Sequence, residues 1–154
     1  MTHQQHIATT IAHILALPDN VISSFRRGNP FDKLLRSYDE FTSDGRGLYR
    51  KALGRQHYRF SRAAYASRLC PSDKRLYGEH KIPLTVIIQR LINSDRSLST
   101  VEGILQSNEV VIITREEQQC LDGGGLKSRM PPNGKCRLAY ARIEIAPETL
   151  GNHL

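Results

Sequence analysis

The run EVVIIT at residues 109–114 constrains the fold more than any other stretch of the chain. Its central residues, Val110 to Ile113, are all β-branched and apolar, and polar residues bound them on both sides. β-Branched side chains favour extended backbone, and an apolar run this short is typical of a buried strand. The second half of the chain is therefore expected to contain a small sheet.

Thr114 ends this run and begins the helical sequence REEQQCL. Glu117 follows three residues later, which completes a T-x-x-E capping box. In such a box the threonine hydroxyl and the glutamate carboxylate each accept a hydrogen bond from the other residue's backbone N–H. The pattern predicts a strand-to-helix junction and gives Glu117 a structural role at the start of the helix.

Apolar residues recur at helical spacing in several other segments. The clearest is residues 84–92, where they repeat as i, i+3, i+4 and i+7 directly after Pro83. The other predicted helices are residues 5–17, two short helices around the RRGNP turn at 26–30, residues 48–68 with a break at Gly54, and a short helix capped by Ser99 or Thr100. The alternation in CRLAYARIEIAP, residues 136–147, predicts a second strand.

These segments predict an α+β fold, in which a helical N-terminal half packs on a small sheet with flanking helices in the second half. At 154 residues the chain is expected to form a single domain, 1–154, with a basic helical part at 21–75 and a mixed α/β part at 76–148. No apolar run approaches the length of a membrane span, and the N-terminus lacks the features of a secretory signal, so a cytoplasmic location is expected. Cys70, Cys120 and Cys136 form no CxxC pair, which argues against a disulfide framework and a zinc knuckle.

The net charge of +7 is concentrated in one part of the sequence. Residues 21–75 carry 13 Lys/Arg against 5 Asp/Glu, whereas residues 76–154 carry 9 of each. Within residues 45–75 nine basic side chains face the single acid Asp73, and four aromatic side chains are interleaved with them. Arginine matches phosphate with two hydrogen bonds and stacks on bases, so this mixture predicts nucleic-acid binding to DNA or RNA. A solvated basic face, with the aromatic residues turned into the core, has the same sequence pattern.

A second basic segment, LKSRMPPNGKCR at 126–137, contains no acid, and two prolines stiffen it. It is predicted to be a preformed anion-contacting loop, although a solvated loop is an equal alternative. The residues predicted to bind nucleic acid are Arg46, Arg50, Lys51, Arg55, Tyr58, Arg59, Arg62, Arg68, Lys127, Lys135 and Arg137.

Motifs for several other chemistries are missing from the sequence. The glycines form neither a G-x-x-x-x-G-K-[ST] loop nor a G-x-G-x-x-G motif after a strand, and G-x-S-x-G does not occur. Chemistry driven by nucleotide hydrolysis and acyl transfer are therefore not expected.

The hexapeptide GEHKIP, residues 78–83, brings Glu79, His80 and Lys81 together ahead of a proline. It resembles the first-strand motif of the HNH (His-Me finger, ββα-metal) nucleases, in which a histidine at a strand end precedes a proline. The resemblance implies metal-dependent cleavage of phosphodiester bonds, in which the histidine activates water and a divalent metal such as Mg²⁺ or Mn²⁺ steadies the phosphate.

On this resemblance His80 is the general base, Glu79 is an acid or metal ligand, and Glu117 is a further metal ligand. The candidates for assisting at the phosphate are Lys81, Arg129 and Arg142. The family's Asn or His after the second strand is replaced here by glutamates, and an ordinary turn leading into the 84–92 helix is the alternative for the hexapeptide.

The sequence thus leaves three functions open. One is a small metal-dependent nuclease, and another is a nucleic-acid-binding regulator or accessory protein without catalysis. The third is a basic module that binds an acidic protein partner. No membrane partner is expected.

Overall fold

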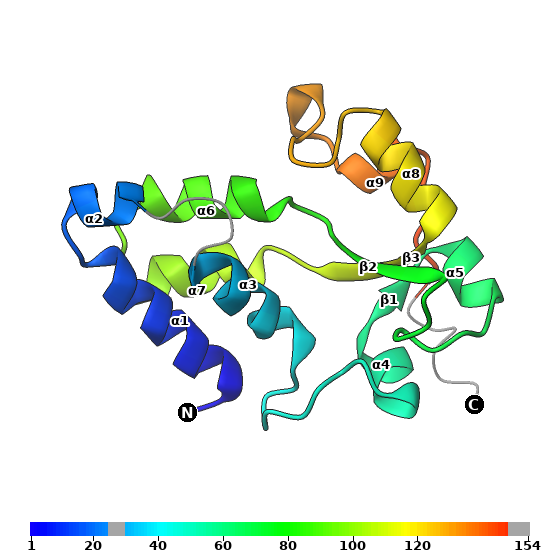
Figure 1. Ribbon diagram of the computed structural model, residues 1–154, viewed down its shortest axis with the longest axis horizontal. Helices are drawn as coiled ribbons and strands as arrows, with labels where there is room; N and C mark the ends of the chain where they lie inside the picture. The colour runs from blue at the N-terminus through cyan, green and yellow to red at the C-terminus, as the bar shows by residue number, and fades with distance from the viewer. Residues whose placement is uncertain (25–29, 148–154) are drawn as a thin grey trace. The chain divides into compact units, whose positions relative to one another are not determined.

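The computed structural model describes residues 1–24 and 30–147, and it has the predicted α+β fold (Figure 1). The chain groups into two compact units that alternate along the sequence. Unit 1 comprises residues 1–47 and 84–108, and unit 2 comprises residues 48–83 and 109–154. The expectation of a single domain stays a prediction, and each unit is best understood from its own core.

Unit 1 is built from helices. They are α1 (His3–Leu15), α2 (Asp19–Ser24), α3 (Pro30–Glu40), α6 (Leu84–Ile92) and α7 (Leu98–Gln106). Helix α1 packs against α3 and α7, and α6 also contacts both of these helices. The predicted 84–92 helix is confirmed at both ends, and its inward residues Ile87 and Leu91 are buried. Arg96 ties two turns of this unit together, because its Nη1 donates to Asp19 Oδ1 at 2.8 Å and to the Leu15 carbonyl at 3.4 Å.

Unit 2 contains a three-stranded sheet. Its strands are β1 (Arg59–Phe60), β2 (Leu76–His80) and β3 (Val110–Thr114), in the order β1-β3-β2. Strand β1 runs parallel to β3 and β2 runs antiparallel to it, with Gly78 opposite Ile112. The central strand is therefore the EVVIIT segment, which confirms the prediction of a buried strand.

The side chains of β3 alternate between two separate apolar clusters. Val110 and Ile112 pack with residues that include Tyr58 and Phe60. Val111 and Ile113 pack on the other face with residues such as Leu138. Because both faces are covered, every position of this strand can be apolar, and the run in the sequence is continuous rather than alternating.

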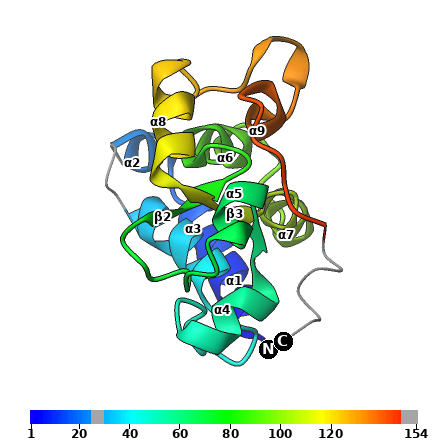
Figure 2. The same ribbon diagram turned by 90° about the vertical axis from the view of Figure 1, so that its right-hand side faces the viewer.

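The helices of unit 2 are α4 (Lys51–His57), α5 (Arg62–Ala66), α8 (Arg115–Gly123) and α9 (Arg137–Tyr140), with a 3₁₀ turn at Pro132–Gly134 (Figure 2). Helices α5 and α8 both contact the sheet. The predicted capping box of α8 is formed: Thr114 Oγ1 accepts from Glu117 N at 3.2 Å, and Glu117 Oε2 accepts from Thr114 N at 2.9 Å. The junction between β3 and α8 is therefore as predicted.

The prediction of one helix across residues 48–68 is only partly right, because α4, β1 and α5 share this stretch. Gly54 does not break α4 but lies inside it. A Cβ atom there would lie 2.5 Å from the Leu48 carbonyl oxygen and would also collide with the Pro71 ring. Glycine is therefore present for close packing rather than for a change of direction.

The prediction of a strand at residues 136–147 is wrong. Residues 137–140 form helix α9, and residues 142–143 close it with bonds from Arg142 N to the Ala139 carbonyl and from Ile143 N to the Leu138 carbonyl. This closure puts Leu138 and Ile143 into the core, so the burial does not follow the two-residue alternation of the sequence. Only an isolated bridge between Ser61 and Ile145 has strand character.

The predicted RRGNP turn lies largely outside the described residues, and α3 begins at its Pro30. Across the ranges that are described, no helix combines the length and apolar character needed to cross a membrane.

Candidate nucleic-acid interface

The two units differ sharply in charge. Unit 2 contains 15 Lys/Arg against 8 Asp/Glu, whereas unit 1 contains 7 of each, so the whole excess of +7 belongs to unit 2. A count that divides the sequence at residue 75 does not reveal this difference, because the basic residues of 109–142 belong to the same unit as those of 48–83. Unit 2 as a whole is therefore positively charged.

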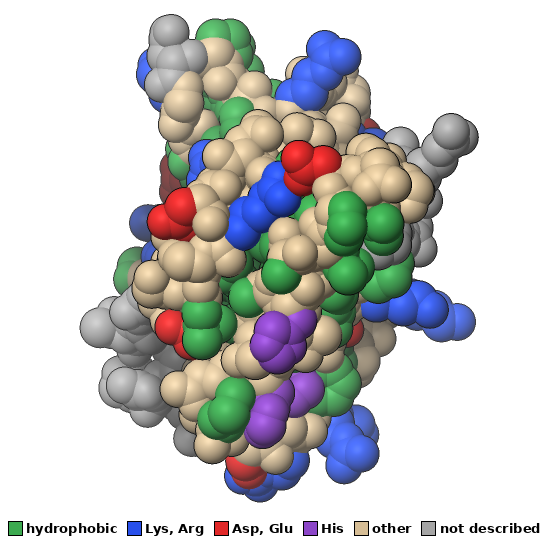
Figure 3. Space-filling model, turned by 90° about the vertical axis from the view of Figure 1, so that its left-hand side faces the viewer, with side chains coloured by type: hydrophobic (Ala, Val, Ile, Leu, Met, Phe, Trp, Pro, Cys, Tyr) green, Lys and Arg blue, Asp and Glu red, His purple; other side chains and the backbone are tan. Residues whose placement is uncertain are grey.

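Unit 1 presents a different kind of surface. On the face drawn in Figure 3, histidine side chains gather among hydrophobic ones over α1, whose sequence includes His3, His6 and His13. The predicted nucleic-acid residue Arg46 also belongs to unit 1. Its Nε lies 2.8 Å from Asp44 Oδ2, and hydrogen bonds from Thr42 and Arg46 lower the pKa of that carboxyl. Arg46 is therefore locally neutralised, and it belongs to a different unit from the other residues predicted to bind nucleic acid.

Some cations of unit 2 are matched by carboxylates. Arg62 Nε lies 2.9 Å from Glu144 Oε2, and Arg59 Nε lies 3.7 Å from Glu109 Oε1. Lys81 is paired with the same Glu109. These pairs remove charge from the parts of the surface where they lie.

Nine exposed cations of unit 2 have no ion pair with any other described residue. They are Arg50, Lys51, Arg68, Lys74, Arg115, Lys127, Arg129, Lys135 and Arg142. Seven of these were predicted from the sequence. Arg50, Lys51, Arg68, Lys127 and Lys135 were predicted to bind nucleic acid, and Arg129 and Arg142 were predicted to assist at its phosphate. Exposed like charges repel one another, so an unbalanced set of this size favours an anionic partner.

A hollow of about 360 Å³ lies among the basic and aromatic residues of unit 2. We call it the unit 2 hollow; it is lined by Arg55, Gln56, His57, Tyr58, Arg59, Phe60, Tyr65, Glu109, Ala146 and Pro147. It brings together Arg55, Tyr58 and Arg59 from the predicted set. The sequence reasoning missed Gln56 and Glu109, and only the pairing of β1 with β3 places Glu109 beside Arg59.

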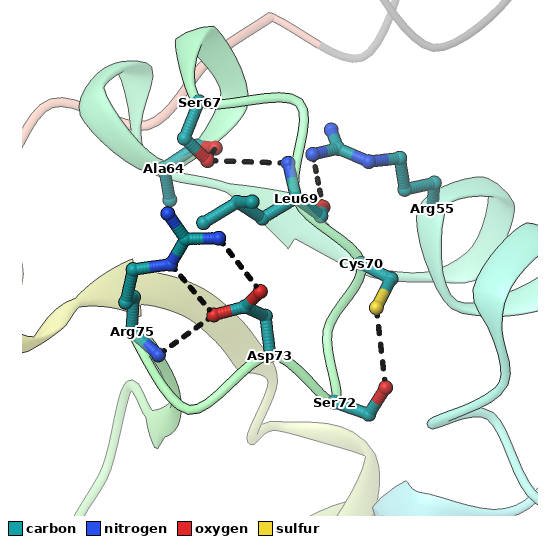
Figure 4. Close-up of polar contacts among 8 residues, drawn as sticks. All are labelled: Arg55, Ala64, Ser67, Leu69, Cys70, Ser72, Asp73 and Arg75. Atoms are coloured by element: carbon teal, nitrogen blue, oxygen red, sulfur yellow. Dashed lines mark hydrogen bonds and ion pairs between the residues drawn. The ribbon is translucent and has the colours of Figure 1, made fainter.

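Arg55 is held in the hollow by several contacts. Its guanidinium carbon lies 4.7 Å from the centroid of the Phe60 ring and 5.9 Å from that of Tyr65. Its Nη2 donates to the Leu69 carbonyl, as Figure 4 shows. Partial burial lowers the pKa of Arg55, but arginine remains charged at neutral pH. The cation is thus held in place by two aromatic rings and one backbone oxygen.

The loop at 67–75 contains Leu69, whose carbonyl accepts the hydrogen bond from Arg55. Polar contacts within the loop hold its backbone in place (Figure 4). Asp73 Oδ1 accepts from both the backbone N and the Nε of Arg75, at 2.9 and 3.0 Å, and these bonds lower the pKa of Asp73 to about 2. Ser67 Oγ donates to the Ala64 carbonyl at 2.6 Å. The exposed Arg68 and Lys74 are therefore carried by a structured loop.

The GEHKIP segment forms the end of β2 and a short bend. His80 pairs with Val110 in the sheet, and Lys81 N extends the ladder with a 2.8 Å bond to the Glu109 carbonyl. Only 8% of His80 is exposed. The first part of GEHKIP therefore belongs to strand β2, whereas the alternative interpretation made the whole segment a turn. The histidine side chain is largely hidden from solvent.

Arg137 holds this segment from inside unit 2, with only 1% of its side chain exposed. Its Nε donates to the His80 carbonyl at 3.1 Å, and its Nη1 donates to the Leu126 carbonyl at 2.7 Å. Its Nη2 forms an ion pair with Glu79, whose side chain is 14% exposed. Burial raises the pKa of the Glu79 carboxyl, while the charge of Arg137 opposes this effect.

Arg137 therefore joins the end of β2 to the start of the basic loop, although the sequence suggested that it contacts nucleic acid. Its hydrogen bonds go to backbone carbonyls and to Glu79, which leaves its guanidinium inside the protein. Glu79 is likewise engaged in this internal ion pair.

The two predicted acidic metal ligands lie apart. Glu117 bonds to its own helix cap and accepts a 2.6 Å hydrogen bond from Ser61 Oγ. Glu79 lies opposite Val111 in the sheet. Thr114 is three residues, or roughly 10 Å, farther along β3, and Glu117 lies beyond Thr114 in α8. In the parts of the chain that the structure describes, no three His, Cys, Asp or Glu side chains cluster as a metal site would require.

No family model, curated protein or solved structure matches the chain. The assignment of a function therefore rests on the residues of the two units alone.

Proposed function

We propose that this protein binds nucleic acid through unit 2 and does not itself cleave it. The observation that carries the proposal is the concentration of the entire net charge in unit 2, with nine exposed cations outside any ion pair in the described structure. A nucleic acid is a dense line of phosphates, and cations that neutralise them release condensed counterions, which drives binding.

The contacts of the GEHKIP segment favour binding over cleavage. The histidine that the nuclease resemblance makes a base is 8% exposed, and the neighbouring glutamate is paired with a buried arginine. Glu117 serves the cap of α8 and the hydroxyl of Ser61. Glu79 and Glu117 therefore have structural partners and His80 is buried, whereas a cleavage site needs a base and a metal that reach the phosphate.

The proposal is tested by fluorescence anisotropy with a labelled oligonucleotide over a range of salt concentrations. We expect log K to fall linearly with log[salt], with a slope of about 0.7–0.9 per phosphate contact. The triple variant Lys127→Ala/Arg129→Ala/Lys135→Ala should bind more weakly and reduce the slope by about 2.

A matched control removes the same number of charges from unit 1, in the variant Lys33→Ala/Arg36→Ala/Arg90→Ala. We expect this variant to bind like the wild type, because these residues belong to the neutral unit. The proposal is wrong if no oligonucleotide binds, if binding ignores salt, or if the two triple variants weaken it equally. Failure to bind any oligonucleotide, with salt-sensitive binding to an acidic polypeptide such as polyglutamate, would indicate a protein partner instead.

A further inference from the structure

We propose that the unit 2 hollow accepts one unstacked nucleotide, so that the protein prefers single-stranded nucleic acid to a duplex. This inference rests on the proposed function and names the class of nucleic acid that the site takes.

The size and shape of the hollow are the first argument. Its volume of about 360 Å³ is within the range of small-ligand pockets and is enough for one base with part of its sugar. A duplex presents a convex backbone, and its bases are stacked inside. A base can enter such a hollow only from a strand that is already unpaired, or after an unpairing step that costs a few kcal/mol.

The second argument is the stacking surface that Arg55 provides. Its guanidinium lies over Phe60 and is fixed by the Leu69 carbonyl, so its plane does not need to be ordered when a ligand arrives. Bases stack on guanidinium planes as well as on aromatic rings, and such stacking tolerates any base because every base has a π-face. Tyr65, half-buried at the same hollow, adds an aromatic ring.

The polar groups of the hollow complete the site. Gln56 is an exposed residue of the hollow, and its side-chain amide carries both donors and an acceptor, so it can bond to the edge of any base. Arg59 also lines the hollow, where its charge is balanced by Glu109. Glu109 is held in position by its pairs with Arg59 and Lys81, and it limits the positive charge inside the hollow. This combination fits an unpaired nucleotide better than an isolated phosphate.

The test compares labelled single strands of mixed sequence, as DNA and as RNA, with a duplex of the same length, about 20 nucleotides. We expect the wild type to bind the single strands about 5- to 100-fold more tightly than the duplex, the range that stacking of one base provides. The informative variant is Gln56→Glu, which puts a negative charge at the hollow without removing a packing contact.

The matched control is Gln119→Glu, because Gln119 is also an exposed glutamine of unit 2 and lies in α8. We expect Gln56→Glu to lose most of the preference for single strands and Gln119→Glu to keep it, with thermal melting confirming that both variants fold. Equal affinity of the wild type for single strands and duplex, or an equal loss of preference in both variants, would overturn the inference. Salt-dependent binding that lacks a strand preference would leave the proposed function intact, whereas no binding at all would remove the proposed function itself.

Discussion

Replacement of Arg137 by methionine tests how much the buried contacts of this arginine stabilise unit 2. Methionine fills a similar space but removes the charge and all of the hydrogen-bond donors. In the wild type these donors reach the carbonyls of His80 and Leu126, and the guanidinium pairs with Glu79. The variant leaves a poorly solvated carboxylate and several backbone oxygens without their partner.

The expected cost follows from this geometry. Removal of one partner of a buried ion pair typically destabilises a protein by about 3–5 kcal/mol. Because the Glu79 side chain remains 14% exposed, water relieves part of this penalty, and we expect a value near the lower limit, about 3 kcal/mol. The double variant Arg137→Met/Glu79→Leu removes the orphaned charge and should recover about 1–2 kcal/mol, although the backbone carbonyls stay unsatisfied.

The cost should also depend on pH in a defined direction. Burial raises the pKa of Glu79 in the folded protein, and loss of the arginine charge raises it further. A folded state with a raised carboxyl pKa binds more protons than the unfolded chain, so its stability falls as pH rises through the interval between the two pKa values. The difference in the free energy of unfolding between Arg137→Met and the wild type should therefore be smallest near pH 4 and should grow toward pH 7.

The assay is urea denaturation followed by far-UV circular dichroism, for the wild type and both variants at several pH values. The reasoning fails if Arg137→Met costs less than about 1 kcal/mol at pH 7, or if its cost grows as the pH is lowered. It also fails if the double variant is no more stable than the single one.

Three further predictions concern single positions. Gly54→Ala should lower the melting temperature, because the added Cβ would lie 2.5 Å from the Leu48 carbonyl oxygen. Gly103→Ala in α7 meets nothing within 4 Å and should stabilise the protein by up to about 1 kcal/mol. Equal changes of the melting temperature in the two variants would contradict the packing argument. Ser61→Ala should cost about 2 kcal/mol in urea denaturation, since its hydroxyl caps α5 through Ala64 N at 3.1 Å and donates to Glu117, and a loss below about 0.5 kcal/mol would refute this role. Supercoiled plasmid incubated with Mg²⁺ should stay intact with the wild type and with His80→Ala; nicking that the substitution abolishes would restore the nuclease hypothesis.

Local patterns in the sequence were sufficient where a segment's structure depends on its own residues. The continuous run at 110–113, the capping box of Thr114 and Glu117, and the 84–92 helix all appear as predicted. Residues 136–147 failed because their burial depends on partners far away in the chain. Arg137 turns inward to reach carbonyls at 80 and 126, and no spacing rule indicates that an arginine will do so.

The candidate site was predictable in part for the same reason. Arg55, Tyr58 and Arg59 are close together in the sequence, and they meet in the unit 2 hollow. Glu109 enters the hollow only because β3 pairs with β1, about 50 residues earlier in the chain. The charge separation between the units likewise depends on how distant segments associate, so a linear count of charges described it incompletely.

The central claim, that nucleic acid binds unit 2, is tested most directly by lysine footprinting. Unit 1 contains one lysine, Lys33, whereas the exposed lysines of unit 2 are Lys51, Lys74, Lys127 and Lys135. The protein is acetylated briefly with and without a short oligonucleotide, and the rate at each lysine is measured by mass spectrometry. We predict that the oligonucleotide slows acetylation at one or more of the exposed unit 2 lysines and leaves Lys33 unchanged. Slower acetylation of Lys33 alone, or no change at any lysine under conditions where the oligonucleotide is bound, would contradict the account.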